Sequence, residues 1–149
     1  MTTWQEFAQQ APALANFGKE RFGGGVAYLA TVRADGGPRV HPVTPIIGEQ
    51  LSSLWSQPHP KARICSDGRY TLHCAVENSS GGSGEFYVRG IGTLTNDLAL
   101  RAQAVATASY TPQDRYILFV LSIDFAFMNC YVEGQPTVQR WQEEADRSA

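Results

Sequence analysis

The stretch that decides the fold is AYLATVRADGGPRVHPVTPIIGEQLSSLWSQPHPK, residues 27–61. Its β-branched and aromatic residues fall into three short runs, which turn residues separate. Asp35-Gly36-Gly37 is a strong hairpin turn between the first two runs, and Gly48-Glu49-Gln50 turns the chain into the third. The stretch therefore predicts an antiparallel hairpin followed by a third strand.

The second strand of this stretch, predicted over Pro38–Ile47, carries prolines at 38, 42 and 45. A proline lacks the backbone N–H that a central strand donates to its neighbour. We therefore expect this strand to lie at a sheet edge, to be bulged, or to face a bound ligand instead of another strand.

The rest of the chain adds short strands and few helices. Strands are predicted at 26–33, 51–56, 70–77, 85–94, 116–123 and 125–133, and helices at 4–21 with a break near Pro12, at 60–66, and at 97–109 with Asn96 as the N-cap. A short segment at 137–141 precedes a polar tail. Because most strands follow one another directly, we predict a mainly β single domain over residues 1–149, a closed or nearly closed antiparallel barrel of six to seven strands with peripheral helices.

The composition narrows the class of protein. The chain has 149 residues, 43% of them hydrophobic, and a net charge of −2, so we expect no nucleic-acid partner. No apolar run is long enough to span a membrane, and no secretory signal is visible at the N-terminus. The three cysteines, Cys65, Cys74 and Cys130, form no CxxC pair, which predicts free thiols and a cytoplasmic location. The histidines lack metal-binding spacing, so no metal site is expected.

Two cations in the first stretch are candidates for binding a phosphate. Arg39 lies in the second strand and Lys61 follows the third, with Ser56 and His59 between them as possible hydrogen-bond donors. The alternative is that both cations are solvated surface charges.

The pattern ATVRADGGPRVHPVTP, then a strand, then KARI-x-x-D-x-RYTLH, resembles the pyridoxamine 5'-phosphate oxidase-like, FMN-binding split-barrel family. The likeness extends from about Val26 through Leu94, and more loosely to Trp141. It implies an antiparallel split barrel, a homodimer with the flavin at the subunit interface, and an FMN-dependent oxidoreductase that acts on a small molecule.

The resemblance also implies which residues touch the flavin. One strand lies along the ring, and the end of the next strand with the lysine after it holds the phosphate. The first set is Arg39, Val40, His41, Pro42 and Val43, and the second is Trp55, Ser56 and Lys61. Relatives place a second basic residue where Pro60 stands here, a departure that puts FMN affinity in doubt and leaves His59 to supply part of that charge.

Two aromatic residues have competing interpretations. His41 is the candidate catalytic residue, because an imidazole beside a flavin can hydrogen-bond the ring or move a proton; the alternative is a histidine packed against a partner subunit. Trp141 either covers the ligand of the partner subunit or anchors the C-terminus by packing.

The family resemblance leaves other activities open. Thr44 stands where a lysine is expected in a true pyridoxamine-phosphate oxidase, and Arg140-Trp141-Gln142 lacks the expected histidine, so that activity is not predicted. The alternatives to an FMN enzyme are a reductase that uses the deazaflavin F420 and a non-catalytic flavin-binding protein. Gly90 and Gly92 lie inside a predicted strand, which indicates a bulge or bend there and not a dinucleotide-binding turn.

Overall fold

The computed structural model describes residues 1–23, 25–55 and 67–145. The predicted helix at 60–66, and with it Cys65, lies outside the described residues. The elements, in chain order, are α1 (Trp4–Gln10), α2 (Pro12–Phe22), β1 (Ala27–Val32), β2 (Pro38–Val43), β3 (Ile46–Ile47), β4 (Leu51–Trp55), β5 (Arg69–Cys74), β6 (Glu85–Thr95), α3 (Leu98–Thr107), β7 (Ile117–Leu121), β8 (Phe125–Val132) and β9 (Gln135–Gln142).

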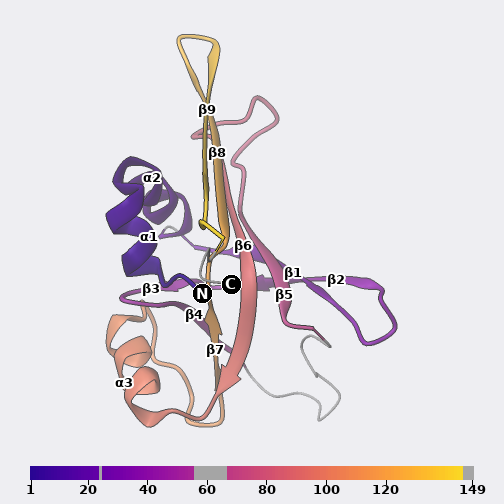
Figure 1. Ribbon diagram of the computed structural model, residues 1–149, viewed down its shortest axis with the longest axis vertical. Coiled ribbons are helices and arrows are strands. Elements are labelled where there is room, and N and C mark those ends of the chain that lie inside the picture. The colour runs from indigo at the N-terminus through magenta and orange to yellow at the C-terminus, as the bar shows by residue number, and fades with distance from the viewer. Residues whose placement is uncertain (24, 56–66, 146–149) are drawn as a thin grey trace.

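The strands form one curled antiparallel sheet in the order β2-β1-β5-β6-β7-β4-β3, with β8 paired to β6 and β9 paired to β8 (Figure 1). The predicted mainly β, antiparallel split barrel with peripheral helices is confirmed. The described residues contain nine strands, against six or seven predicted. Thr44-Pro45 divides the predicted second strand into β2 and β3, and the segment near the C-terminus is a full strand.

The long strand β6 joins the two halves of the sheet. Its residues 85–89 pair with β8 and its residues 92–95 pair with β7. Between them, Gly90 and Ile91 face the three residues 122–124, which makes a β-bulge between β7 and β8. A Cβ on Gly90 would lie 1.9 Å from the carbonyl oxygen of Ser122. The predicted bulge is confirmed, and a side chain at this position would collide with backbone.

The N-terminal helices cover the inner face of β6 and β8 (Figure 1). Thr3 and Glu6 form the capping box that begins α1, and the helix breaks at Ala11 before Pro12, as predicted. Gly18 of α2 meets the ring of Phe86 so closely that a Cβ there would lie 2.2 Å from Cζ. This close approach seals a core that also contains Phe7, Leu29, Leu51, Leu72, Val88 and Leu121, all with no exposed surface.

A smaller core lies under α3, where Ala104 packs with Ile46, Leu54 and Leu118. The N-cap of α3 is Asp97 and not Asn96, because Oδ1 of Asp97 accepts hydrogen bonds from the backbone N–H groups of Ala99 and Leu100. The prediction was therefore wrong by one residue.

The hairpin of β8 and β9 was not predicted. Glu133 and Gly134 both have positive φ, 51° and 77°, as a two-residue hairpin turn requires. The hairpin projects beyond the rest of the sheet (Figure 1), since β6 pairs with β8 only as far as Asn129. No helix among the described residues is long and apolar enough to cross a membrane.

Candidate functional site

The predicted flavin-binding strand, β2, presents its residues to two sides. Arg39, His41 and Val43 are partly buried, whereas Val40, between them, is 61% exposed. Among the described residues β2 pairs only with β1. Pro38 and Pro42 are four residues apart, so the backbone nitrogens of both can point to the same side of the strand. That side can be the edge away from β1, where a missing N–H removes no hydrogen bond to β1. The expectation of an edge strand is confirmed.

Arg39 carries a buried nitrogen that the described residues leave unused. Its Nε donates to Oγ1 of Thr31 at 3.4 Å, and Thr31 is itself buried. Its Nη2 is buried and has no hydrogen-bond partner in the described part of the chain. Buried polar groups in native proteins normally have partners, so this guanidinium is suited to bind an anion from outside the chain.

His41 lies near enough to Arg39 to feel its charge, and Trp55 packs against His41. We call Arg39, His41 and Trp55 the β2 cluster. The two rings have centroids 5.7 Å apart. The indole N–H of Trp55 donates to Oγ of Ser53 at 2.6 Å, which fixes the ring. Partial burial and the nearby charge of Arg39 lower the pKa of His41 below its usual value, so the imidazole is neutral at neutral pH.

The remaining predicted phosphate-binding residues, Ser56, His59 and Lys61, lie outside the described residues. They follow directly on β4, whose last residue is Trp55 of the β2 cluster.

Trp141 lies apart from the β2 cluster within one chain. It is on β9, which β8, β6, β5 and β1 separate from β2 in the pairing order. Its ring packs 5.0 Å from that of Phe7, and its N–H donates to Gln10 Oε1 at 3.3 Å. Within the subunit it anchors β9 to α1, so its predicted role as a ligand cover depends on a partner subunit.

A groove of about 470 Å³, which the sequence motifs did not indicate, lies beside the β2 cluster. Thr31, which holds Arg39, also lines this groove. The other lining residues are Ala30, Val32, Pro38, Arg69, Tyr70, Thr71, Arg89, Gly90 and Asp124. The sequence does hold a signal for part of this groove, because buried and outward-facing residues alternate along β5 and β6. Arg69, Thr71 and Arg89 therefore lie on the side opposite the buried Tyr70, Leu72 and Val88.

The outer face of the same strands carries a row of aromatic residues in cross-strand register. Tyr28 pairs with His73, His73 with Tyr87, Tyr87 with Phe127, and Phe127 with Arg140. We call these five residues the aromatic row. The Tyr87 ring stacks 6.0 Å from His73 and 5.1 Å from Phe127, and cross-strand pairs of this kind stabilise sheets.

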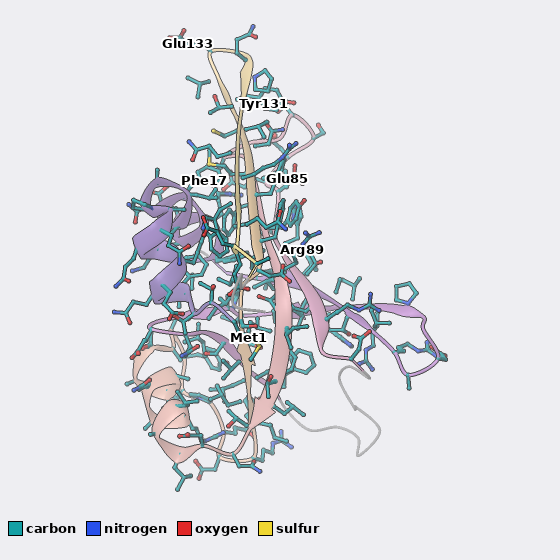
Figure 2. The ribbon with its side chains drawn as sticks, viewed as in Figure 1. Met1, Phe17, Glu85, Arg89, Tyr131 and Glu133 are labelled. Carbon is teal, nitrogen blue, oxygen red and sulfur yellow. The ribbon has the colours of Figure 1, made fainter. Side chains whose placement is uncertain are left out.

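No helix of the described chain covers the aromatic row. Figure 2 shows Phe17 on the helix side of the sheet and Glu85 and Arg89 on the other side. Tyr28 is 47% exposed, and Tyr131 and Val138 on the projecting hairpin are 58% and 48% exposed. Large exposed apolar surfaces of this kind mark interaction sites.

Within the described residues, His73 is the member of the row that forms an ion pair, with Glu85. Its Nδ1 lies 2.6 Å from the carbonyl oxygen of Cys74, and its Nε2 lies 2.9 Å from Oε1 of Glu85. The side chain of Cys74, then Glu85 and the Cys74 carbonyl, raise the pKa of His73 to about 9 against the effect of partial burial. The described residues contain no cluster of His, Cys, Asp and Glu that could hold a metal ion.

Solved structures resemble this fold, whereas no family model and no curated protein matches the chain. A Clostridium acetobutylicum protein of the pyridoxinephosphate oxidase family, related to general stress protein 26, superposes with a TM-score of 0.59 at 9% identity over 91% of this chain and 94% of its own. HutZ, the heme storage protein from Vibrio cholerae, gives 0.57 at 18% identity over 76% and 89%. The heme binding protein from Mycobacterium smegmatis gives 0.56 at 15% identity over 77% of this chain, which spans about half, 52%, of that protein.

These likenesses establish the fold of the chain, the pyridoxamine 5'-phosphate oxidase-like split barrel that the sequence predicted. Among the neighbours this fold occurs both in a protein of the oxidase family and in proteins named for heme. The ligand of this chain must therefore be argued from its own residues.

Proposed function

We propose that this protein binds FMN beside β2 and is an FMN-dependent oxidoreductase with a small-molecule substrate. The observation that carries the proposal is the buried Nη2 of Arg39, which has no partner among the described residues. A guanidinium in this state matches the nearly dianionic phosphate of FMN or another acidic group of the cofactor. Lys61, with Ser56 and His59, completes the phosphate site in this proposal.

The chain's own residues would orient the cofactor. Trp55, fixed by Ser53, offers an indole face beside His41, and Val43 packs against the main core. The unpaired edge of β2 leaves backbone groups that can bond the polar edge of the flavin ring. The bound flavin would supply hydride or electron transfer.

Among the described residues of this site, His41 is able to move a proton. Its pKa is lowered, so it is neutral and able to accept a proton at neutral pH. A phosphate bound at Arg39 would offset the cation that lowers this pKa, and the imidazole would then bind a proton more readily.

We propose that the protein is a homodimer and that the aromatic row lies in its interface. Tyr28, Tyr131 and Val138 are large, exposed and without a covering helix in the described chain. Aromatic residues and arginines are enriched at such interfaces, and the row ends at Arg140. A two-fold partner seated here would also adjoin the groove, which shares Arg89 with this face.

Heme is a weaker candidate ligand, although two of the neighbours are named for it. Both nitrogens of His73 are already engaged, by Cys74 and Glu85. Of the two histidines in the described residues, that leaves His41 as the available iron ligand, next to a cation that suits an acidic group. F420, or flavin binding without catalysis, remains an alternative to the FMN enzyme.

The absorbance spectrum of the purified protein distinguishes these ligands. We expect a flavin spectrum, release of FMN on denaturation, and reduction of the bound flavin by NADH or NADPH. A Soret band would support heme, and binding of added F420 alone would support the deazaflavin. A colourless protein that binds no added FMN would contradict the proposal. A cytoplasmic location, with Cys74 and Cys130 as free thiols, accords with this function.

A further inference from the structure

The groove beside the β2 cluster has a rigid base. The N–H of Asp124 donates to the carbonyl of Arg89 at 2.9 Å, and the carbonyl of Asp124 accepts from Glu143 at 2.9 Å. The hydroxyl of Tyr70 donates to the Ser122 carbonyl at 2.8 Å. The β-bulge is therefore held from three strands, and it places the Asp124 carboxylate at a fixed position in the wall of the groove.

Two charged side chains of this groove, Arg89 and Asp124, are only loosely paired with each other. Arg89 lies over the ring of Phe125, 4.4 Å from its centroid, and its Nε is 3.5 Å from Oδ1 of Asp124. That distance is at the limit of a hydrogen bond, and Oδ1 is buried without a hydrogen-bond partner in the described chain. The Asp124 side chain as a whole is 50% exposed, so its carboxylate can still be reached by a donor from a ligand.

The second cation of the groove is Arg69. It forms an ion pair with Asp67, with 2.6 Å between Nη2 and Oδ2, and its side chain is 68% exposed. Its Nε also donates to Oδ2 of Asp67 at 2.7 Å. A guanidinium has five N–H donors, so this exposed arginine can hold an incoming anion beside the partners that it already has.

Among the described residues, the formal charges that line or adjoin this groove balance. Arg69 and Arg89 contribute two positive charges, and Asp67 and Asp124 contribute two negative charges. A balanced site does not favour a simple anion over water, whereas it suits a ligand that carries both charges itself. Ala30, Val32 and Pro38 supply an apolar wall for the carbon skeleton between them.

We propose that this groove binds a small zwitterion, with its phosphate or carboxylate at Arg69 and Arg89 and its ammonium group at Asp124. Binding itself does not depend on the flavin. The role of the zwitterion as the substrate of the enzyme rests on the proposed function, because Thr31 and Pro38 place the groove next to the strand along which the flavin would lie.

The test uses two probes that differ only in the cation, phosphoethanolamine and ethyl phosphate, followed by ³¹P NMR with the full-length protein. The ³¹P resonance of phosphoethanolamine should shift as protein is added, and phosphoethanolamine should bind more tightly than ethyl phosphate. Arg89→Gln and Arg69→Gln should each lower the affinity for phosphoethanolamine by about tenfold or more. Asp124→Asn should lower the affinity for phosphoethanolamine to that for ethyl phosphate, and it should leave the affinity for ethyl phosphate unchanged.

Arg140→Gln is the matched control, because this arginine lies over Phe127 of the same face but outside the groove. It should bind both probes as the wild type does. The titrations use flavin-free protein, so failure of the flavin proposal and failure of this one are separate results. Thermal unfolding shows whether each variant is folded.

Three results would overturn the proposal. One is the absence of any shift with wild-type protein at probe concentrations up to about 10 mM. Another is wild-type affinity in a folded Arg89→Gln variant. The third is equal affinity of the wild type for the two probes, which would reduce the groove to an anion site without the zwitterion.

Discussion

The two faces of β5, β6 and β8 differ although the residues alternate along the same strands. The inner face, with Leu72, Phe86 and Ala126, is closed by α1 and α2 and has no exposed surface. The outer face carries His73, Tyr87, Arg89 and Phe127, all at least partly exposed, and Figure 2 shows Arg89 on the side away from the N-terminal helices. Stability is therefore concentrated on the inner side, and the groups available for ligands and partners lie on the outer side and at the β2 edge.

The largest expected contrast is between one phenylalanine from each face. Phe86→Ala removes a fully buried ring and should lower the free energy of unfolding by about 3–5 kcal/mol. Phe127→Ala removes a partly exposed ring and should cost a single chain about 1 kcal/mol. Urea unfolding measures both. The cost of Phe127→Ala should increase with protein concentration if the outer face binds a second copy, and equal costs at every concentration would contradict that interface.

The contact of α2 with the inner face is the next most sensitive point. Gly18→Ala places a methyl group 2.2 Å from Phe86 Cζ, and we expect a loss of about 1–3 kcal/mol despite the better helix propensity of alanine. Asn16→Ala, on the exposed side of the same helix, should be neutral or slightly stabilising. Chemical denaturation of the two variants tests this, and a stabilised Gly18→Ala protein would show that the helix seals the inner face less tightly than described.

The helix α3 covers the other half of the sheet, over β3 and β4, and its first turn depends on the N-cap Asp97. Asp97→Ala removes the cap of two backbone N–H groups and should cost about 1 kcal/mol. Asn96→Ala should leave the unfolding free energy unchanged. A larger effect of Asn96→Ala would restore the cap that the sequence alone predicted.

The smallest expected effect is the pH dependence of the outer face. The pKa of His73 is raised from 6.5 to about 9, so its contribution to stability is complete below pH 6.5 and is lost as the pH rises through about 9. Because its side chain is 35% exposed, we expect less than about 1 kcal/mol. The free energy of unfolding, measured between pH 6 and pH 10, should show this decline in the wild type and not in His73→Gln. The same pH profile in both proteins would show that His73 does not cause the decline.

Much of the fold follows from local signals. Runs of β-branched and aromatic residues between turns predicted most of the strands, and Pro12 predicted the helix break. The prolines of β2 left an edge strand, a bulge or a ligand-facing strand open, and the structure has an edge strand. The hairpin of β9 was missed because its strand is polar and paired mainly with β8, so it shows no buried face. Its sequence signal was the turn Glu133-Gly134.

The candidate site was less accessible to prediction. Arg39, His41 and Trp55 were named from the sequence, and the resemblance to a family supplied their context. The groove residues Arg69, Arg89 and Asp124 were not identified as a site from the sequence. Their proximity depends on the register of β5 with β6 and on a bulge between β7 and β8. Such placement is a long-range property that no local pattern encodes.

The most direct test of the central claim is a titration of FMN fluorescence with flavin-free protein. The wild type should quench FMN with saturation at one flavin per chain, and Arg39→Gln should weaken the affinity by about tenfold or more, because a charged hydrogen-bonding group is lost. Arg33→Gln, on the same hairpin but paired with Asp35 at 2.6 Å, should bind as the wild type does. Absence of quenching, or equal affinity in the folded Arg39→Gln variant, would contradict the account.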